Sequence, residues 1–95
     1  MIKTETCKAL EMLENSCVIE VHENLLHNWS LDSLDCDGGE IVFECSYTDS
    51  HSYIYEFSFS KDALMEAVIK DNNIIMKDDT GEEVEVGCYS LTPVV

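Results

Sequence analysis

The fold is decided by residues 41–60, which read IVFECSYTDSHSYIYEFSFS. Apolar and polar side chains alternate in two runs that a short polar turn at residues 48–51 separates. Two alternating runs joined by such a turn are typical of a β-hairpin with one buried face. We therefore predict a hairpin whose apolar, aromatic face packs in the core. The residues of that face are Ile41, Phe43, Cys45, Tyr47, Tyr53, Tyr55, Phe57 and Phe59.

Ahead of this hairpin, the spacing of apolar residues predicts a helix and a strand. Residues 5–15 carry Cys7, Leu10 and Leu13 at helical spacing, with Thr4 as a candidate N-cap. In residues 17–22 the alternation puts Cys17, Ile19 and Val21 on one buried face. Residues 24–39 show no clear period, and we predict a long connection there, with room for a helical turn.

Beyond the hairpin, the pattern predicts a second helix and a second hairpin. Ser60 can cap a helix over residues 61–70, in which Leu64, Ala67 and Val68 share one side. Strands over residues 74–77 and 82–89 follow, joined by a turn at residues 78–81, and Pro93 marks a terminal tail. We expect one domain over residues 1–95 of α+β class: an antiparallel sheet of about five strands packed on one face by two short helices.

The charge of the chain is its clearest pointer to function. Twenty carboxylates face five lysines and no arginine, so the formal net charge is −15. Such a chain repels a nucleic-acid backbone and an anionic membrane, and self-repulsion costs it stability, which favours a basic protein as its partner. Five cysteines without a CxxC pair, and no long apolar segment, favour reduced thiols and a cytoplasmic location.

The strand phases predict where a partner binds. Six glutamates fall opposite the apolar faces of the predicted strands, and together they can form a carboxylate lattice whose spacing imitates a nucleic-acid backbone. Trp29 is either an interface anchor in the long connection or a plug at the end of the core. The predicted contacts are Glu20, Glu40, Glu44, Glu56, Glu83 and Glu85, with Asp32, Asp35 and Asp37 flanking them.

Nothing in the sequence predicts catalysis, a metal or a cofactor. Counting a calcium loop from Asp35 puts Glu40 where glycine is needed and Ser46 where glutamate is needed. The histidines and cysteines lack the short ligand spacing of a zinc module. Acidic neighbours make Cys36 a poor nucleophile. We therefore expect a protein that is not an enzyme, with no catalytic, metal or cofactor site.

In size, charge and cytosolic character the whole chain resembles the small acidic inhibitors that phages encode against host defence. These include anti-CRISPR and anti-restriction proteins that mimic nucleic acids. The resemblance carries no motif and transfers no residue. It implies a partner with a positively charged nucleic-acid-binding surface, namely a nuclease complex, in the cytoplasm of a host cell.

Two alternatives belong to other classes. An immunity or antitoxin-like protein would neutralise a basic toxin at an exosite, without imitating nucleic acid. A structural homodimeric subunit would pair two copies through a sheet, with Val42 and Ile54 on the outer face making a dry contact. The sequence does not fix the oligomeric state.

Overall fold

The computed structural model describes residues 4–90, so Pro93 and the predicted tail lie outside the described residues. The order of elements is α1 (Thr4–Asn15), β1 (Val18–Val21), β2 (Asn24–Leu26), β3 (Ser30–Leu31), β4 (Ile41–Thr48), β5 (Ile54–Ser60), α2 (Lys61–Met65), β6 (Val68–Lys70), β7 (Asn73–Lys77) and β8 (Glu83–Tyr89). All strand pairs are antiparallel.

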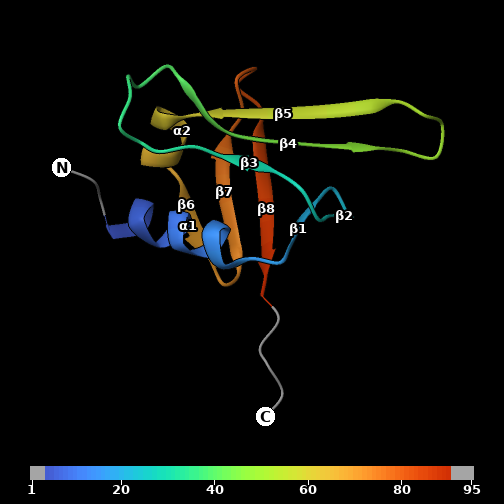
Figure 1. The fold of residues 1–95 in the computed structure, drawn as a ribbon, viewed down its shortest axis with the longest axis horizontal. Helices are drawn as coiled ribbons and strands as arrows, with labels where there is room; N and C mark the ends of the chain where they lie inside the picture. The colour runs from blue at the N-terminus through green and yellow to red at the C-terminus, as the bar shows by residue number, and fades with distance from the viewer. Residues whose placement is uncertain (1–3, 91–95) are drawn as a thin grey trace, which may run out of the picture.

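The strands form two sheets rather than one. The five-strand sheet has the order β2-β1-β8-β7-β6, and the three-strand sheet has the order β3-β4-β5. The α+β class, an antiparallel five-strand sheet and two helices are therefore confirmed. The predicted hairpin of residues 41–60 is present as β4 and β5, but it lies in the second sheet, whose strands run across those of the first (Figure 1).

The core lies between the two sheets and the helices. Phe43 and Phe59 are fully buried and stack at a ring distance of 5.4 Å. They belong to one buried cluster with residues of the five-strand sheet, among them Ile19, Val84 and Val86, and with Ala9, Leu13 and Leu64 of the helices. Each sheet therefore turns one face inward, and its outer face looks to the opposite side of the molecule.

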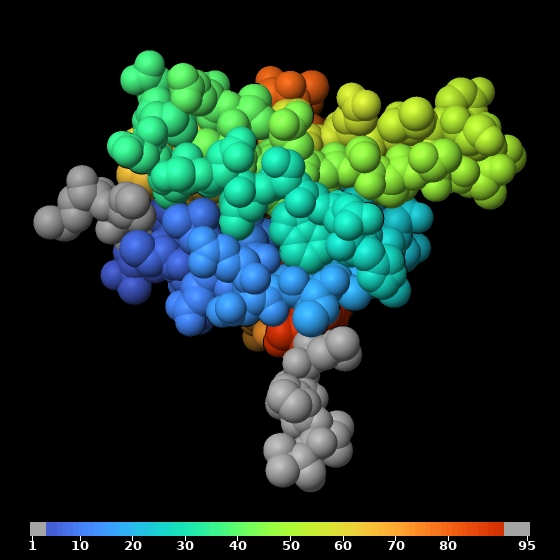
Figure 2. Space-filling model, viewed as in Figure 1, coloured from blue at the N-terminus to red at the C-terminus, as the bar shows by residue number. Residues whose placement is uncertain are grey.

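The prediction for β4 and β5 was right in pairing and partly wrong in burial. A register irregularity between Ile41 and Phe43 exposes Ile41 and buries Val42, which we had placed on the outer face. Tyr53 and Tyr55, which we had placed in the core, are exposed because the far end of the hairpin extends beyond the body of the protein (Figure 2).

The helices differ from the prediction in their buried faces and length. In α1 the buried residues are Thr6, Ala9 and Leu13, whereas Cys7 is exposed. Small side chains on that face let α1 approach α2 closely, and the Thr6 hydroxyl donates to the Leu64 carbonyl oxygen at 3.1 Å. Thr4 lies inside the helix rather than at its N-cap.

The second helix is shorter than the ten residues predicted. Ser60 does cap α2, its Oγ accepting from the Ala63 amide at 3.2 Å, but the helix ends at Met65. Val68 and Ile69 are β-branched and favour a strand, and they form β6, which a tight turn at Asp71 joins to β7. Val68 is consequently exposed rather than buried.

The connection predicted over residues 24–39 contains two short strands. His22 and Glu23 adopt positive φ values of 51° and 67°, which makes a tight turn between β1 and β2. Strands β2 and β3 have three and two residues. An alternating pattern needs four or more residues to stand out, so these strands carry no detectable period.

Candidate partner-binding surface

The six predicted glutamates do not form one lattice. Glu20, Glu83 and Glu85 lie on β1 and β8 of the five-strand sheet, whereas Glu44 and Glu56 lie on β4 and β5. All five point away from the core by strand alternation, so the two groups occupy opposite outer faces of the molecule. The prediction of a single continuous sheet face is wrong, because the hairpin belongs to a separate sheet.

The outer face of the five-strand sheet mixes charges and apolar groups. Lys77 lies directly across from Glu83, and Ile75 lies across from Glu85. Glu20 is half-buried and accepts a hydrogen bond from the Tyr89 hydroxyl at 2.9 Å. This hydrogen bond, together with the negative charge of Glu20, raises the pKa of Tyr89. A face with both signs of charge is typical of an ordinary solvated sheet.

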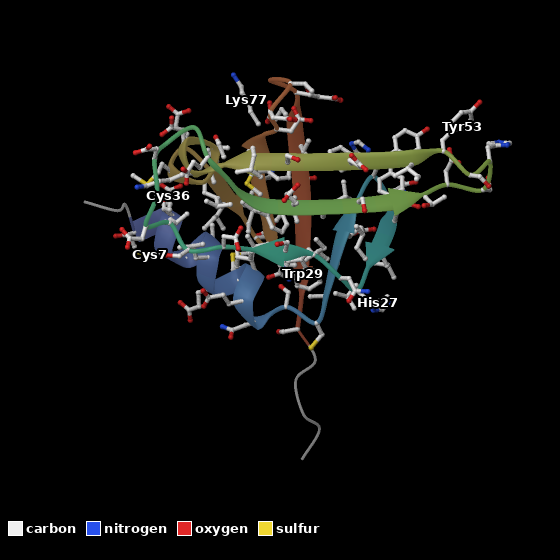
Figure 3. The ribbon with its side chains drawn as sticks, turned by 45° about the horizontal axis from the view of Figure 1, so that its top comes forward. Cys7, His27, Trp29, Cys36, Tyr53 and Lys77 are labelled. Atoms are coloured by element: carbon white, nitrogen blue, oxygen red, sulfur yellow. The ribbon has the colours of Figure 1, made fainter. Side chains whose placement is uncertain are left out.

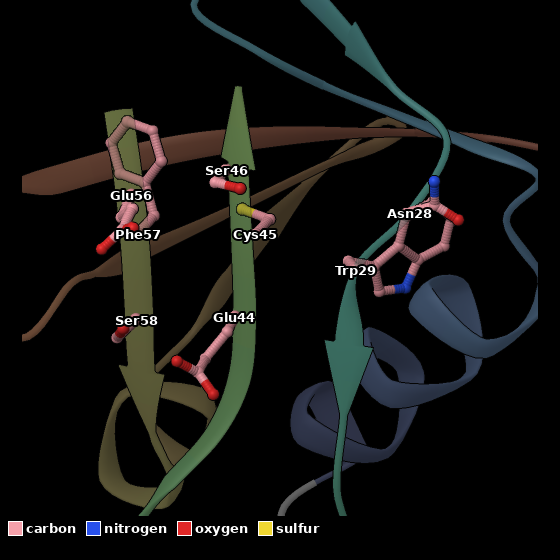
Figure 4. Close-up of a pocket in the computed structure, with 8 residues that line it drawn as sticks. All are labelled: Asn28, Trp29, Glu44, Cys45, Ser46, Glu56, Phe57 and Ser58. Carbon is pink, nitrogen blue, oxygen red and sulfur yellow. The ribbon is translucent and has the colours of Figure 1, made fainter. Parts of the chain in front are cut away.

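The outer face of β4 and β5 carries carboxylates and hydroxyls. Glu44 pairs with Ser58 and Glu56 pairs with Ser46, so the two glutamates are diagonal neighbours about 7–8 Å apart. Both border a hollow of about 350 Å³ that opens between the hairpin and the start of β3 (Figure 4). Its lining residues are Asn28, Trp29, Glu44, Cys45, Ser46, Glu56, Phe57 and Ser58.

The loop between β3 and β4 adds carboxylates beside this hairpin. Hydrogen bonds from the amides of Lys61 and Asp62 to the carbonyls of Glu40 and Gly38 fasten the loop to the start of α2. The Lys61 ammonium donates to the Cys36 carbonyl oxygen at 2.9 Å, so the nearby cation is held against the backbone. We define the acidic face as the exposed residues Asp32, Asp35, Asp37, Glu40, Glu44 and Glu56.

Asp62 was not among the predicted contacts, although the loop brings it close to the acidic face. Its amide donates to the Gly38 carbonyl oxygen, and its carboxylate lies so close to Gly38 that a larger side chain there would collide with it. The sequence placed Asp62 only in the first turn of a helix. The contact with Gly38 depends on how the loop folds back, which no local pattern predicts.

Lysines are distributed unevenly over the fold. Residues 9–60 contain no lysine or arginine, yet they hold eleven carboxylates: Glu11, Glu14, Glu20, Glu23, Asp32, Asp35, Asp37, Glu40, Glu44, Asp49 and Glu56. Lys70 and Lys77 lie on β6 and β7, in the five-strand sheet. The acidic face therefore has one nearby cation, Lys61, against six carboxylates, whereas Lys70 and Lys77 lie on the five-strand sheet.

Trp29 has features of both predicted roles, an interface anchor and a plug at the end of the core. Its side chain is half-buried and packs against the core, yet it also lines the hollow beside Glu44 and Glu56 (Figures 3 and 4). A second hollow of about 560 Å³, bordered by Glu14 and Asp32, lies on its other side. Trp29 is thus both a part of the core's edge and an accessible aromatic surface among carboxylates.

The thiols and histidines do not assemble into a reactive or metal-binding cluster in residues 4–90. No group of three or more His, Cys, Asp or Glu side chains is placed to hold a metal ion within that range. Desolvation and the neighbouring Glu40 raise the pKa of Cys36, which keeps this thiol protonated and weakly nucleophilic.

Comparisons of the chain with protein-family models, curated proteins and solved structures give no match. In the part of the chain that the structure describes, neither helix is long and apolar enough to cross a membrane.

Proposed function

We propose that the protein is an acidic inhibitor that binds the positively charged nucleic-acid-binding surface of a nuclease complex in the cytoplasm of a host cell. The observation that carries the proposal is the local excess of negative charge: the acidic face holds six exposed carboxylates against one nearby lysine, Lys61. The protein acts by steric and electrostatic competition and performs no reaction.

The spacing of carboxylates supports a nucleic-acid mimic. Glu44 and Glu56 are held about 7–8 Å apart on the paired strands, and the other four carboxylates follow in the loop that the Lys61 and Asp62 amides fasten to α2. Basic nucleic-acid-binding surfaces gain most of their affinity from neutralising such arrays. Nucleic acid itself is repelled by the net charge of −15, so the partner is a protein.

An immunity or antitoxin-like protein that neutralises a basic toxin uses the same kind of surface. It differs in the target, because an exosite binder leaves the toxin's nucleic-acid channel free.

The structural homodimer has less support. Its predicted dry contact consists of Val42 and Ile54, and Val42 is buried in the protein itself. Like charges on two copies also repel each other.

The test is capture of the partner on immobilised protein, followed by elution with duplex DNA or RNA and, separately, with salt. We expect a basic nuclease that competing nucleic acid releases at constant ionic strength and that high salt also releases. A captured partner that nucleic acid does not release would replace mimicry with the exosite mechanism. An interaction indifferent to salt would contradict an electrostatic interface altogether.

A further inference from the structure

The far end of the β4–β5 hairpin projects from the body of the protein, and the acidic face assigns it no role. We define the arm as residues 45–57. Strand β3 pairs with β4 only at Phe43 and Glu44, and the Asp79 amide reaches β5 only at the Ser58 carbonyl oxygen. Within residues 4–90, the arm therefore extends as a two-stranded ribbon beyond the other strands (Figure 2).

One face of the arm is a row of aromatic rings that begins in the core and ends in solvent. The exposed fraction rises along β5 from 0% at Phe59 and 6% at Phe57 to 41% at Tyr55 and 66% at Tyr53. Tyr47 on β4 stacks on Tyr55 at 4.9 Å and an interplanar angle of 21°. The row leaves three tyrosines at the free end, with Tyr53 at the tip (Figure 3).

The arm is held in shape before any partner arrives. A two-stranded ribbon alone is only marginally stable in water. Here Asp49 fixes the turn, accepting from the amides of His51 and Tyr53 at 2.8 and 3.0 Å and from the Tyr55 hydroxyl at 3.2 Å. Ser52 has the positive φ of 67° that a three-residue hairpin loop requires.

The base of the arm is braced by the turn between β1 and β2. The His22 ring meets Phe57 edge-on at 5.3 Å, and its Nδ1 is 3.1 Å from the Tyr47 hydroxyl. His22 and Glu23 hold positive φ values without being glycine, a conformation that costs free energy and is found where a side chain must be aimed. A preorganised aromatic surface loses little entropy on binding.

The charge around the tyrosines selects a cationic partner. Asp49 lies in the turn of the arm and Glu23 in the bracing turn, whereas Glu56 points to the opposite face of the ribbon, and residues 9–60 contain no lysine or arginine. The hydrogen bond to Asp49 raises the pKa of Tyr55, and desolvation raises that of Tyr47, so both rings stay neutral. Neutral tyrosine faces bind guanidinium groups, and adjacent carboxylates strengthen such binding.

We propose that the tyrosine face of the arm, formed by Tyr47, Tyr53 and Tyr55, binds an arginine-bearing segment of the basic partner. This inference rests on the proposed function for the existence of that partner and names where it is anchored. The acidic face supplies long-range attraction, while the arm supplies a contact that binds arginine more tightly than lysine. A second copy of the chain is disfavoured as the occupant because it brings a further fifteen negative charges to the same place.

The test uses an octa-arginine peptide and three double variants of exposed residues. Tyr53→Leu with Tyr55→Leu keeps apolar area but removes the ring faces, whereas Tyr53→Phe with Tyr55→Phe keeps the rings. Leu25→Ser with Tyr89→Leu changes exposed residues of the other sheet. Affinity is measured by titration calorimetry at fixed salt, with circular dichroism to confirm folding.

We expect the leucine variant to bind octa-arginine about fivefold or more weakly than the wild type. The phenylalanine variant and the variant of the other sheet should stay within about twofold. Octa-lysine should bind the wild type more weakly than octa-arginine and be indifferent to the leucine changes. Amide NMR shifts on adding octa-arginine should be largest within residues 45–57.

Several results would overturn the inference. These are equal binding of octa-arginine by the leucine and phenylalanine variants, peptide-induced shifts confined to other parts of the chain, and self-association that the leucine variant abolishes. Binding of a single-stranded oligonucleotide through the arm would also overturn it. Because the assay needs no natural partner, its failure is distinct from failure of the nucleic-acid competition that tests the proposed function.

Discussion

At the scale of single residues, the five cysteines separate into three environments. Cys7 and Cys17 are exposed, Cys36 is half-buried, and Cys45 and Cys88 are buried. Burial raises the pKa of Cys45 to about 12. Desolvation also raises the pKa of Cys88, against a hydrogen bond from Ser16 that lowers it.

These environments predict the order in which the thiols react. A raised pKa lowers the thiolate fraction, and only the thiolate attacks a disulfide reagent. At pH 8 we expect Cys7 and Cys17 to react first, Cys36 more slowly, and Cys45 and Cys88 only after unfolding. Reaction with a chromogenic disulfide, followed by peptide mass mapping, measures the order. Early labelling of Cys45 would contradict the burial described above.

Thr6 offers a second test at this scale, because it is a fully buried polar side chain. Its hydroxyl donates to the carbonyl oxygens of Leu64 and Met65 at 3.1 and 3.3 Å, which joins the two helices. Thr6→Val keeps the shape but removes this hydrogen bond, while the Leu64 carbonyl oxygen still accepts from the Ala67 amide, so the free energy of unfolding should fall by about 0.5–1.5 kcal/mol. The matched change Thr4→Val, at an exposed position of the same helix, should cost less than about 0.5 kcal/mol. Equal losses in urea denaturation would refute the role of this hydroxyl.

At the scale of elements, the arm depends on His22. His22→Ala removes the edge contact with Phe57 and the hydrogen bond with the Tyr47 hydroxyl. We expect amide hydrogens of residues 47–55 to exchange about fivefold or more faster, while those of β7 and β8 are unchanged. His27→Ala is the control, because His27 is exposed. If both variants exchange alike throughout the arm, His22 does not brace it.

The elements also mark what the sequence predicts and what it does not. The pairs β4 with β5 and β7 with β8 follow from alternation over strands of five to eight residues and from clear turn signals. The sequence predicts α1 in extent, and of its predicted stripe Leu13 is buried and Leu10 packs against the core, whereas Cys7 is exposed. The small residues Thr6 and Ala9 fill the contact instead.

The candidate site was predictable residue by residue but not as a surface. Strand phase correctly points Glu44 and Glu56 outward, and it does the same for Glu20 and Glu85. It gives no information about which strands share a sheet, since that depends on long-range pairing of β1 with β8. The exposure of Tyr53 likewise depends on where the rest of the body ends.

At the scale of the whole molecule, the net charge of −15 sets how stability responds to salt. Repulsion among carboxylates opposes the compact state, and salt screens it. We expect Tm in thermal circular dichroism to rise between about 10 mM and 500 mM NaCl, by about 4–8 °C for each 1 kcal/mol gained. A Tm that falls with salt would mean that net attraction between charges holds the fold.

Acidification should first stabilise and then destabilise the protein. As the pH falls from 7 towards the sequence pI of about 4.1, the net charge and its repulsion decrease. Desolvation acts to raise the pKa of Asp78, but hydrogen bonds from Thr80, Glu82 and Gly81 outweigh it, so its pKa lies below the ordinary 3.8. The unfolded state therefore binds this proton at higher pH than the folded state does. The stability that Asp78 contributes is complete above pH 3.8 and is lost as the pH falls through the folded pKa.

Because the pKa of Asp78 is lowered in the folded state, part of the loss of stability at acidic pH should come from the turn that contains Asp78. Asp78→Asn should lower Tm at neutral pH and flatten the fall below pH 3.8, whereas Asp71→Asn, an exposed control in another turn, should leave that limb unchanged. Thermal melts between pH 2 and 7 decide the matter. An unaltered acid limb in Asp78→Asn would place the responsible carboxylate elsewhere.

The measurement that tests the central claim most directly compares two charge-reversed variants for affinity to the partner that the immobilised protein captures. One carries Glu40→Lys, Glu44→Lys and Glu56→Lys on the acidic face. The other carries Glu20→Lys, Glu83→Lys and Glu85→Lys on the five-strand sheet, and both change the net charge by the same amount. We predict that the first variant loses binding, with Tm equal to or above that of the wild type, while the second keeps most of its binding. The Tm of the second variant should fall, because it loses the Tyr89–Glu20 hydrogen bond and sets a lysine across from Lys77, so both affinities are measured well below the lower Tm. Equal losses would mean that net charge alone, and no particular face, attracts the partner; full binding by the first variant would contradict the acidic face as the interface.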